Sequence, residues 1–345
     1  MDHASVAQLE VHETLELAAN ESPLGPSRKV ANAVISQLAQ ANRYPERDCS
    51  NTERAIARAL SFPAAHVTVG PGSFGMLRLI SEAYMSAGSE VVFADPSYPV
   101  YRGLAQQAGC IPVAVPLTPD HRHDLPAMAQ AITPATRVVF ICNPNNPTGR
   151  PVSHAELAQF MAQVPAHVLV VIDEAYFEYA SGEELPDGTA WVRAGHHVVV
   201  LRTFSKAYGL AGMRIGYGVA HEQVAARLRQ VRDPFSVNSM AQAAARAALT
   251  DEQHLASVRA LNDQVRAELC AAVSRMGLRY IPSVTNFVMI QCGGDDLAIC
   301  EQLAQHGVKV RPGSEYGMRG WLRVSTGTLR QCQRFLLTLQ SVLFN

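Results

Sequence analysis

Residues 202–214 read Arg-Thr-Phe-Ser-Lys-Ala-Tyr-Gly-Leu-Ala-Gly-Met-Arg, and they include one of only three lysines in a chain of 345 residues. The chain has 29 Lys and Arg residues in total, and its other two lysines are Lys29 and Lys309. Lys206 follows the apolar run His197–Leu201 and lies in a segment rich in glycine and alanine. A lysine in a partly buried polar setting has its pKa lowered and can act as a nucleophile or a base. The segment therefore predicts a reactive amine at Lys206.

The same segment carries groups that bind phosphate. The hydroxyls of Thr203 and Ser205 and the guanidinium of Arg214 can hold one phosphate group together. A second candidate for phosphate binding is the glycine loop Gly70-Pro71-Gly72-Ser73-Phe74-Gly75. This loop follows the apolar stretch His66–Val69 and precedes a helical stretch. A glycine turn at the start of a helix presents free backbone N–H groups and the positive end of the helix dipole to a phosphate.

This glycine loop leaves two functions open. It matches G-x-G-x-x-G, and the next predicted strand is followed by Asp95, which is the pattern of a dinucleotide-binding fingerprint. An NAD-dependent dehydrogenase is therefore one alternative. The loop by itself indicates a phosphate more strongly than a dinucleotide, and a plain tight turn before a helix would look the same.

Short apolar runs alternate along the chain with stretches rich in Ala, Leu and Arg. Several runs are continuously apolar, which is typical of strands covered on both faces in a mostly parallel sheet. We therefore predict an α/β fold, with long helices over residues 221–276 and a second, smaller α+β domain in the C-terminal third. The predicted strands are Val67–Val69, Glu90–Ala94, Arg137–Cys142, His167–Ile172, His197–Leu201 and Ile215–Val219 in the large domain, and Thr285–Gln291 and Lys309–Arg311 in the small one.

Polar residues follow the predicted strands at the ends where ligands bind in such sheets. Asp173 ends the most hydrophobic strand, where a carboxylate needs a cationic partner such as a protonated ring nitrogen. Tyr176 could donate a hydrogen bond to an oxygen on the same ring. The loop Asn143–Gly149 is rigid and polar. A helix N-cap at Asp173 and Asx turns in the loop are the structural alternatives.

Three segments, Asn143–Gly149, Asp173–Tyr176 and Ser205–Arg214, together resemble the fold-type I, pyridoxal-phosphate-dependent aminotransferases, closest to the histidinol-phosphate aminotransferase branch. The resemblance runs from about residue 18 to residue 330. It implies a large domain with a seven-stranded, mostly parallel sheet at residues 45–240 and a small domain at residues 241–345. Residues 1–44 would form an N-terminal arm and part of the small domain. Further matching segments are Ala19–Glu21, Asn42–Glu46, Asp95–Tyr101, Val231–Asn238 and Leu322–Thr328.

The resemblance implies pyridoxal 5′-phosphate as the cofactor, held by a Schiff base on Lys206. Asp173 would pair with the ring nitrogen and keep the ring an electron sink. Asn146 and Tyr176 would bond the phenolic oxygen of the ring, and Tyr98 would stack on its face. The residues expected to hold the cofactor phosphate are Gly72, Ser73, Thr203, Ser205 and Arg214.

The resemblance also implies partners. Tyr44 would reach the cofactor phosphate of a neighbouring subunit, which predicts a homodimer with shared active sites. Arg323 would bind the anionic end of the substrate, with Arg311 as a second anchor and with Asn20 and Ser22 on the substrate side.

The implied reaction moves an amino group from an amino donor to a 2-oxo acid, commonly 2-oxoglutarate, with Lys206 transferring the proton. Histidinol phosphate is the favoured donor. An aromatic or specialised amino acid is the first alternative, because one guanidinium binds a carboxylate as well as a phosphate. A phospho-amino-acid decarboxylase of the same fold and a non-catalytic, cofactor-sensing regulator are others.

Four residues depart from the family pattern and leave the substrate open. Phe74 and Gly75 stand where acidic residues are frequent after the phosphate-loop Gly-Ser. Ser22 and Ser236 stand where Asn or an aromatic residue is frequent.

Composition excludes several classes of function. The formal net charge of −1 indicates no general attraction to nucleic acid or to an anionic membrane. The longest apolar runs have the length of strands, so no membrane span is predicted, and the first residues do not resemble a signal peptide. The seven cysteines are scattered without a Cys-x-x-Cys motif, which predicts no metal site and favours reduced thiols in the cytoplasm.

Overall fold

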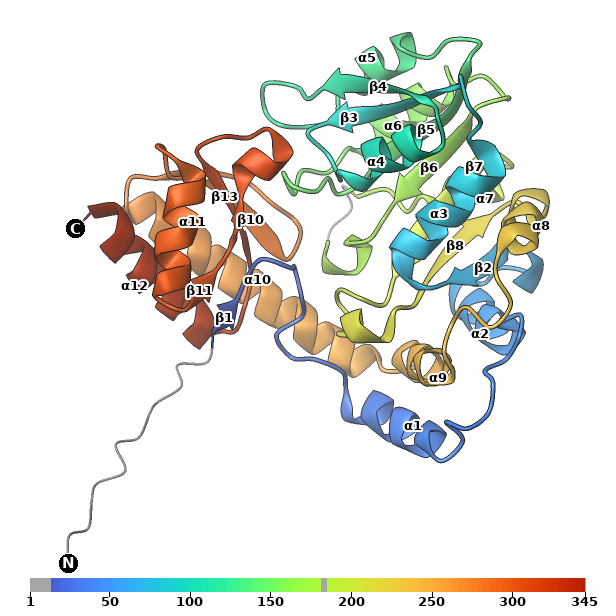
Figure 1. The fold of residues 1–345 in the computed structure, drawn as a ribbon, viewed down its shortest axis with the longest axis horizontal. Helices are drawn as coiled ribbons and strands as arrows, with labels where there is room; N and C mark the ends of the chain where they lie inside the picture. Colours follow the sequence, from blue (N-terminus) through green and yellow to red (C-terminus); the bar gives the residue numbers. More distant parts are fainter. Residues whose placement is uncertain (1–13, 181–184, 345) are drawn as a thin grey trace, which may run out of the picture.

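A sheet with the strand order β2-β8-β7-β6-β5-β3-β4 forms the centre of the larger part of the computed structural model, which describes residues 14–180 and 185–344 (Figure 1). Within these residues, β8 is the one strand of the seven that runs opposite to the other six. The predicted α/β class and the mostly parallel, seven-stranded sheet are therefore confirmed. The strands are β2 (Val67–Gly70), β3 (Glu90–Asp95), β4 (Ile111–Pro116), β5 (Thr136–Cys142), β6 (Leu169–Asp173), β7 (Val198–Thr203) and β8 (Gly216–Ala220).

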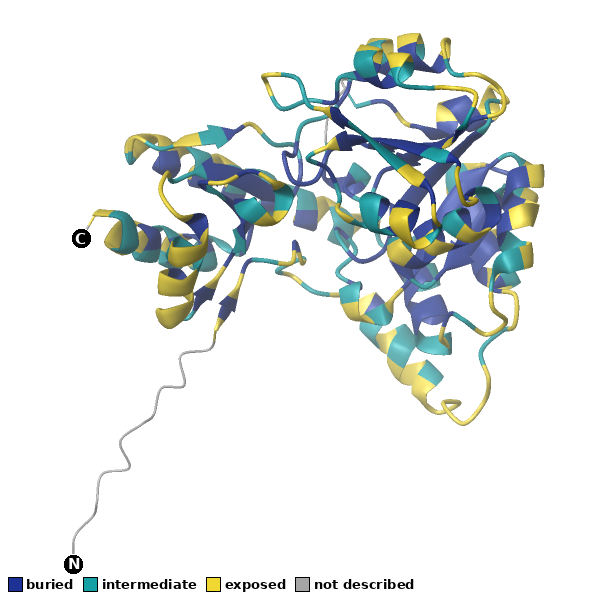
Figure 2. Cartoon of the chain, turned by 45° about the horizontal axis from the view of Figure 1, so that its top comes forward, coloured by how far each residue is buried: buried dark blue, intermediate teal, exposed yellow. Residues whose placement is uncertain are grey.

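Helices cover both faces of this sheet, which is why its inner strands are apolar on both sides. One face is covered by α2, α5, α6, α7 and α9, and the opposite face by α3, α4 and α8. The inner strands are buried and the outer sides of the helices are exposed (Figure 2). The helices of this part are α1 (Arg28–Leu38), α2 (Ser50–Leu60), α3 (Gly72–Tyr84), α4 (Val100–Gln107), α5 (Leu125–Gln130), α6 (His154–Met161), α7 (Thr189–Arg193), α8 (Glu222–Val231) and α9 (Ser239–Ala248).

One edge of the large sheet is formed by β4, which the sequence analysis did not predict. Pro112 and Pro116 interrupt its strand pattern, because proline has no N–H for a sheet hydrogen bond. Proline is tolerated in a strand that has a neighbour on one side, as β4 has in β3.

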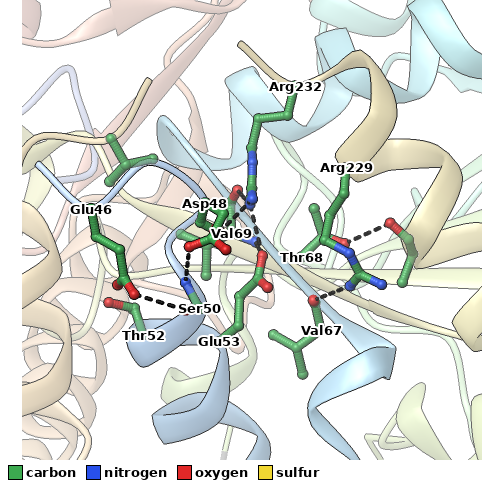
Figure 3. A network of polar contacts seen from close by, with 12 residues as sticks. Glu46, Asp48, Ser50, Thr52, Glu53, Val67, Thr68, Val69, Arg229 and Arg232 are labelled. Atoms are coloured by element: carbon green, nitrogen blue, oxygen red, sulfur yellow. Dashed lines mark hydrogen bonds and ion pairs between the residues drawn. The ribbon is translucent and has the colours of Figure 1, made fainter. Parts of the chain in front are cut away.

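Side chains bind the backbone along the other edge, formed by β2 (Figure 3). The Val69 N–H donates to Glu53 Oε1 at 3.2 Å, and the Val69 carbonyl accepts from Arg232 Nη1 at 2.8 Å. Arg232 also pairs with Glu53 at 2.7 Å, and Arg229 Nη1 donates to the Val67 carbonyl at 2.9 Å. These groups on the open side of β2 therefore have partners without a further strand.

The smaller part is built on an antiparallel sheet with the order β12-β13-β10-β9 and on the parallel pair β1-β11. The predicted strand at Lys309–Arg311 is divided at Val310, because β11 pairs with β1 while β12 pairs with β13. The sequence analysis did not predict β9 or β13. The elements are β1 (Leu15–Glu16), α10 (Glu252–Arg275), β9 (Arg279–Ile281), β10 (Phe287–Gln291), α11 (Asp296–Gln305), β11 (Val308–Lys309), β12 (Arg311–Pro312), β13 (Trp321–Ser325) and α12 (Leu329–Phe344).

The predicted helical stretch at residues 221–276 forms α8, α9 and α10, with Pro234 in the connection between α8 and α9. Residues of α9 and Val30 of α1 belong to the core of the large sheet. Figure 1 shows the N-terminal segment running from β1 in the small part to α1 beside the large one. The boundaries at residues 44/45 and 240/241 remain predictions.

Candidate active site

A cavity of about 230 Å³ lies at the carboxyl ends of the large-sheet strands and reaches β12 and β13 of the small part. The strand register places Cys142 beside Asp173 and Asp173 beside Leu201, so residues distant in sequence meet at this edge. The residues predicted for the site that line the cavity are Asn20, Ser73, Tyr98, Asn146, Asp173, Tyr176, Lys206, Arg311 and Arg323.

Lys206 presents its amine to this cavity. Its Nζ donates to the Ala19 carbonyl at 3.0 Å and lies 5.8 Å from the centre of the Tyr176 ring. Burial, together with the nearby charges of Arg323 and Arg214, lowers the pKa of Lys206 to about 8, although the charge of Glu21 acts in the opposite direction. A much larger fraction of this amine is therefore neutral at physiological pH than of an ordinary lysine.

Asp173 is buried at the end of β6 and accepts two hydrogen bonds. Tyr101 Oη donates to its Oδ2 at 2.8 Å, and the Ala175 N–H donates to its Oδ1 at 3.2 Å. Burial raises the pKa of Asp173 to about 6, although both hydrogen bonds act in the opposite direction. No Lys, Arg or His of residues 14–180 and 185–344 lies within ion-pair distance of it. A buried carboxylate without a cation fits a ligand that brings a positive charge.

Two hydrogen bonds orient the side chains of Tyr176 and Asn146 in the cavity. Asn20 Nδ2 donates to Tyr176 Oη at 3.0 Å, which leaves the Tyr176 proton free for an acceptor in the cavity. Arg323 Nη1 donates to Asn146 Oδ1 at 2.7 Å. Because that oxygen is occupied, the Asn146 side-chain NH₂ remains available as a donor.

The groups predicted for phosphate binding lie together at the start of α3. The Gly72 backbone is left-handed at φ +78°, and a Cβ there would lie 2.6 Å from Arg214 Nη2. Arg214 Nη1 donates to Ser205 Oγ at 3.4 Å, and the Ser205 N–H donates to Thr203 Oγ1 at 3.1 Å. Backbone N–H groups, two hydroxyls and a guanidinium at a helix N-terminus fit a phosphate.

The departures Phe74 and Gly75 do not disturb this arrangement. A Cβ on Gly75 would lie 2.6 Å from Pro71 Cγ, so the proline that precedes α3 requires glycine at this position. Phe74 is 40% exposed. Neither Phe74 nor Ser236 is among the described residues that line the cavity.

Two arginines from neighbouring strands of the small part line the cavity. Arg311 of β12 is paired with Arg323 of β13 in the strand register, so both point to the same face of the small sheet. Arg323 is 4% exposed, and Arg311 Nη1 forms an ion pair with Glu315 Oε2 at 3.0 Å. Tyr316 lines the same cavity, with the Arg323 guanidinium 5.3 Å from the centre of its ring.

Two predicted site residues lie outside both this cavity and the group of phosphate-binding residues at the start of α3. Tyr44 is 85% exposed and contacts Phe235, with the ring centres 5.1 Å apart. Ser22 lines a separate cavity with Glu21 and Pro23. Their proposed roles therefore have no support from the cavity lining of this single chain.

Comparison with known proteins decides the family. The family model described as aminotransferase class I and II matches residues 12–339. The chain belongs to this aminotransferase family.

Named relatives place the aminotransferase in one branch. A histidinol-phosphate aminotransferase of Moorella thermoacetica is 43% identical over 97% of this chain and 87% of its own length. A histidinol-phosphate aminotransferase 2 of Pseudomonas aeruginosa is 45% identical over 95% of this chain and 89% of its own. The crystal structure of histidinol-phosphate aminotransferase from Sinorhizobium meliloti in complex with pyridoxal-5′-phosphate has a TM-score of 0.90 and 30% identity, covering 96% of this chain and 91% of that one.

The aminotransferase is thus a pyridoxal-phosphate-dependent enzyme of the histidinol-phosphate aminotransferase branch, as the sequence analysis predicted. The residues present fit this cofactor, since the cavity joins a low-pKa amine, a buried carboxylate without a cation and a phosphate cradle. The match includes Gly70–Gly75, so the loop belongs to an aminotransferase and the dehydrogenase alternative is not supported. An L-threonine-O-3-phosphate decarboxylase of Porphyromonas gingivalis is similar at 23% identity with a TM-score of 0.85, which shows the fold alone.

The sequence analysis missed four residues that line the cavity of the aminotransferase, and it missed the buried Tyr101. Cys142 is the last residue of a predicted strand, directly before the Asn143–Gly149 loop, and this position could have indicated it. Tyr316 stands between Arg311 and Arg323 in sequence, with glycines on both sides. The missed lining residues are Ala19, Cys142, Ala175 and Tyr316.

Substituting Gly216 tests the phosphate cradle of the aminotransferase. A Cβ at Gly216 would lie 2.8 Å from both Gly72 C and Ser73 N, which are backbone atoms that cannot turn away. We expect Gly216→Ala to weaken cofactor binding more than about tenfold and to lower the free energy of unfolding by about 1–3 kcal/mol. Gly212→Ala is the control, because nothing lies within 4 Å of a Cβ there. Titration of the apoenzyme with cofactor measures the affinity, and equal affinities in both variants would contradict the cradle.

Proposed function

We propose that this aminotransferase transfers the amino group of histidinol phosphate to a 2-oxo acid, 2-oxoglutarate. The observation that carries the proposal is the pair of guanidiniums, Arg311 and Arg323, on the substrate side of the cavity. Histidinol phosphate has no carboxylate, so its phosphate is the group for these arginines to bind. Curated relatives that are 41–45% identical to this chain are named for the same substrate, which supports the proposal.

Each residue of the site would have its own role in holding the cofactor or moving a proton. Lys206 would hold the cofactor through its amine, and its neutral Nζ would move the proton of the substrate's α-carbon. Asp173 would pair with the ring nitrogen, and Asn146 and Tyr176 would donate to the phenolic oxygen. Tyr98 would stack on the ring. Pyridoxal phosphate, when bound, supplies the electron sink that makes the α-carbon acidic.

The phosphate of the cofactor would lie at the start of α3, held by the residues that meet there. Its ligands are Gly72, Ser73, Thr203, Ser205 and Arg214. Asn20 and Ser22 remain proposed on the substrate side, with the Asn20 side chain also orienting Tyr176.

The pH dependence of cofactor capture follows from the amine of Lys206. The neutral amine is the attacking form, and its pKa is lowered from the ordinary 10.5 to about 8. We expect the rate at which the apoenzyme captures pyridoxal phosphate to rise between about pH 7 and pH 9 and to level off above that range. Stopped-flow absorbance of the apoenzyme gives this rate. A rate that still rises tenfold per unit from pH 9 to pH 10 would show an ordinary lysine.

The choice of amino donor is tested with three compounds offered one at a time to the cofactor-loaded enzyme. We expect histidinol phosphate to convert the cofactor to its amine form, with kcat/KM at least about 100-fold above that of histidinol, which lacks the phosphate. Equal conversion of both would contradict phosphate recognition by Arg311 and Arg323. Preference for phenylalanine would favour the aromatic alternative.

We also propose a homodimer with shared active sites. Tyr44 lies outside the cavity of its own chain, is 85% exposed and contacts Phe235, which is also exposed. A partner subunit over this surface would bury these side chains and bring Tyr44 to the partner's cofactor phosphate.

The cytoplasm is the proposed location. All seven cysteines lie in the described residues, and each is free of a disulfide, which fits a reducing compartment. No helix within residues 14–180 and 185–344 is long and apolar enough to cross a membrane.

A further inference from the structure

Tyr101 contacts two residues that line the cavity, Tyr98 and Asp173, and has no solvent exposure itself. It belongs to the first turn of α4, three residues after Tyr98, which lines the cavity. Its ring stacks on Phe140, with ring centres 4.5 Å apart and planes 7° from parallel, and the Tyr98 ring meets it edge-on at 5.7 Å. The Tyr101 ring is therefore fixed on two sides by aromatic packing.

The hydroxyl of Tyr101 is aimed at Asp173. Its oxygen lies 2.8 Å from Asp173 Oδ2, and since an ionised carboxylate has no proton to give, the phenol is the donor. Burial and the charge of Asp173 raise the pKa of Tyr101 well above its ordinary value, so the phenol keeps its proton at every working pH. Tyr101 therefore remains the hydrogen-bond donor to Asp173 throughout the working pH range.

A buried carboxylate and a pyridine nitrogen that share one proton have two arrangements. The proton lies on nitrogen in the charged pair and on oxygen in the neutral pair. Burial favours the neutral pair, because desolvation penalises both charges. A hydrogen bond donated to the carboxylate stabilises the charged pair instead, because it is stronger to the ion than to the neutral acid.

We propose that Tyr101 is a positioning residue that acts through Asp173 and keeps the shared proton on the cofactor's ring nitrogen, where electron withdrawal requires it. The inference rests on the proposed pairing of Asp173 with that nitrogen. Tyr101 touches neither cofactor nor substrate in this arrangement, since the Asp173 carboxylate lies between its hydroxyl and the ring.

The test is ¹⁵N NMR of the enzyme loaded with cofactor that is ¹⁵N-labelled in the ring, using Tyr101→Phe, which removes one oxygen from a packed ring. We expect the ring resonance to move from the pyridinium towards the neutral pyridine position, and kcat to fall about tenfold to 100-fold with KM nearly unchanged. The control is Tyr84→Phe, because Tyr84 lies in a pocket with His197 and Arg227, away from the cofactor cavity. A Tyr101→Phe enzyme with the wild-type resonance and kcat would overturn the inference.

A second measurement uses the apoenzyme, so it does not depend on turnover or on cofactor loading. Infrared difference spectra report the protonation of Asp173, whose midpoint near pH 6 should rise by about one unit when the Tyr101 donor is lost. Should Tyr101→Phe fail to fold, Tyr101→3-fluorotyrosine retains the ring and strengthens the donor, and the midpoint should then fall. An unmoved midpoint in the folded variant would overturn the inference.

Asp173→Asn separates this inference from the proposal on which it rests. If Asp173→Asn moves the ring resonance and Tyr101→Phe does not, Asp173 binds the nitrogen and the inference on Tyr101 is wrong. If neither moves it, the pairing of Asp173 with the nitrogen is itself wrong, and the inference falls with it.

Discussion

Lys206→Ala should lower kcat by about 10⁴-fold or more, because the substitution removes both the nucleophile that holds the cofactor and the base that moves the proton. Lys206 can supply a neutral amine near physiological pH, because burial lowers its pKa to about 8. Arginine cannot take over, since its guanidinium stays charged in proteins. Lys206→Arg should therefore be as inactive as Lys206→Ala.

The scarcity of lysine makes this prediction easy to check. Borohydride reduction of the loaded enzyme should fix the cofactor to one peptide, and mass spectrometry should identify Lys206. Lys309→Ala is the matched control, because Lys309 is exposed in the short strand β11. An adduct on Lys29 or Lys309, or full turnover by Lys206→Ala, would contradict the assignment.

Asp173→Asn should lower kcat by about 150- to 5000-fold. An amide cannot neutralise a protonated ring nitrogen, and losing one partner of a buried charge pair costs about 3–5 kcal/mol, which corresponds to such a factor in rate. The apoenzyme should behave differently. Asp173 is buried there without a cation, so removal of its charge should not lower the melting temperature of the apoenzyme.

This pair of measurements distinguishes a chemical role for Asp173 from a structural one. Steady-state kinetics gives kcat, and thermal unfolding of the apoenzyme gives the melting temperature. Asp263→Asn is the control for loss of an aspartate charge, because Asp263 forms an ion pair with Arg266 on α10. Unchanged kcat in Asp173→Asn, or an apoenzyme that melts far below the wild type, would contradict the proposed role.

The fold could be predicted where strands are buried on both faces, because such strands appear as continuous apolar runs. Runs such as Val67–Val69 and Glu90–Ala94 differ from the strands in the structure by one residue at an end. Strands were not predicted where proline or a charged residue interrupts the apolar run. Strand β4 is interrupted by edge prolines, and β13 carries the buried Arg323 in its middle. The division at Val310 depends on pairing with β1, which no local pattern contains.

The lining residues that belong to recognisable sequence motifs could be predicted, because residues at the ends of neighbouring parallel strands meet at one edge of the sheet. Asp173 and Lys206 are examples, although their roles stay predictions. Tyr101 and Tyr316 could not be assigned in this way. The role of Tyr101 depends on its hydroxyl reaching a strand two positions away in the sheet, and the position of Tyr316 depends on how the small sheet lies against the large one.

Both edges of the large sheet resist the addition of another strand. An exposed edge with free N–H and C=O groups is a template for pairing with a foreign chain, and so for aggregation. The prolines of β4 remove donors on one side, and the charged network of Glu53, Arg229 and Arg232 occupies β2 on the other. Addition of a foreign strand is thereby disfavoured at both edges of the large sheet.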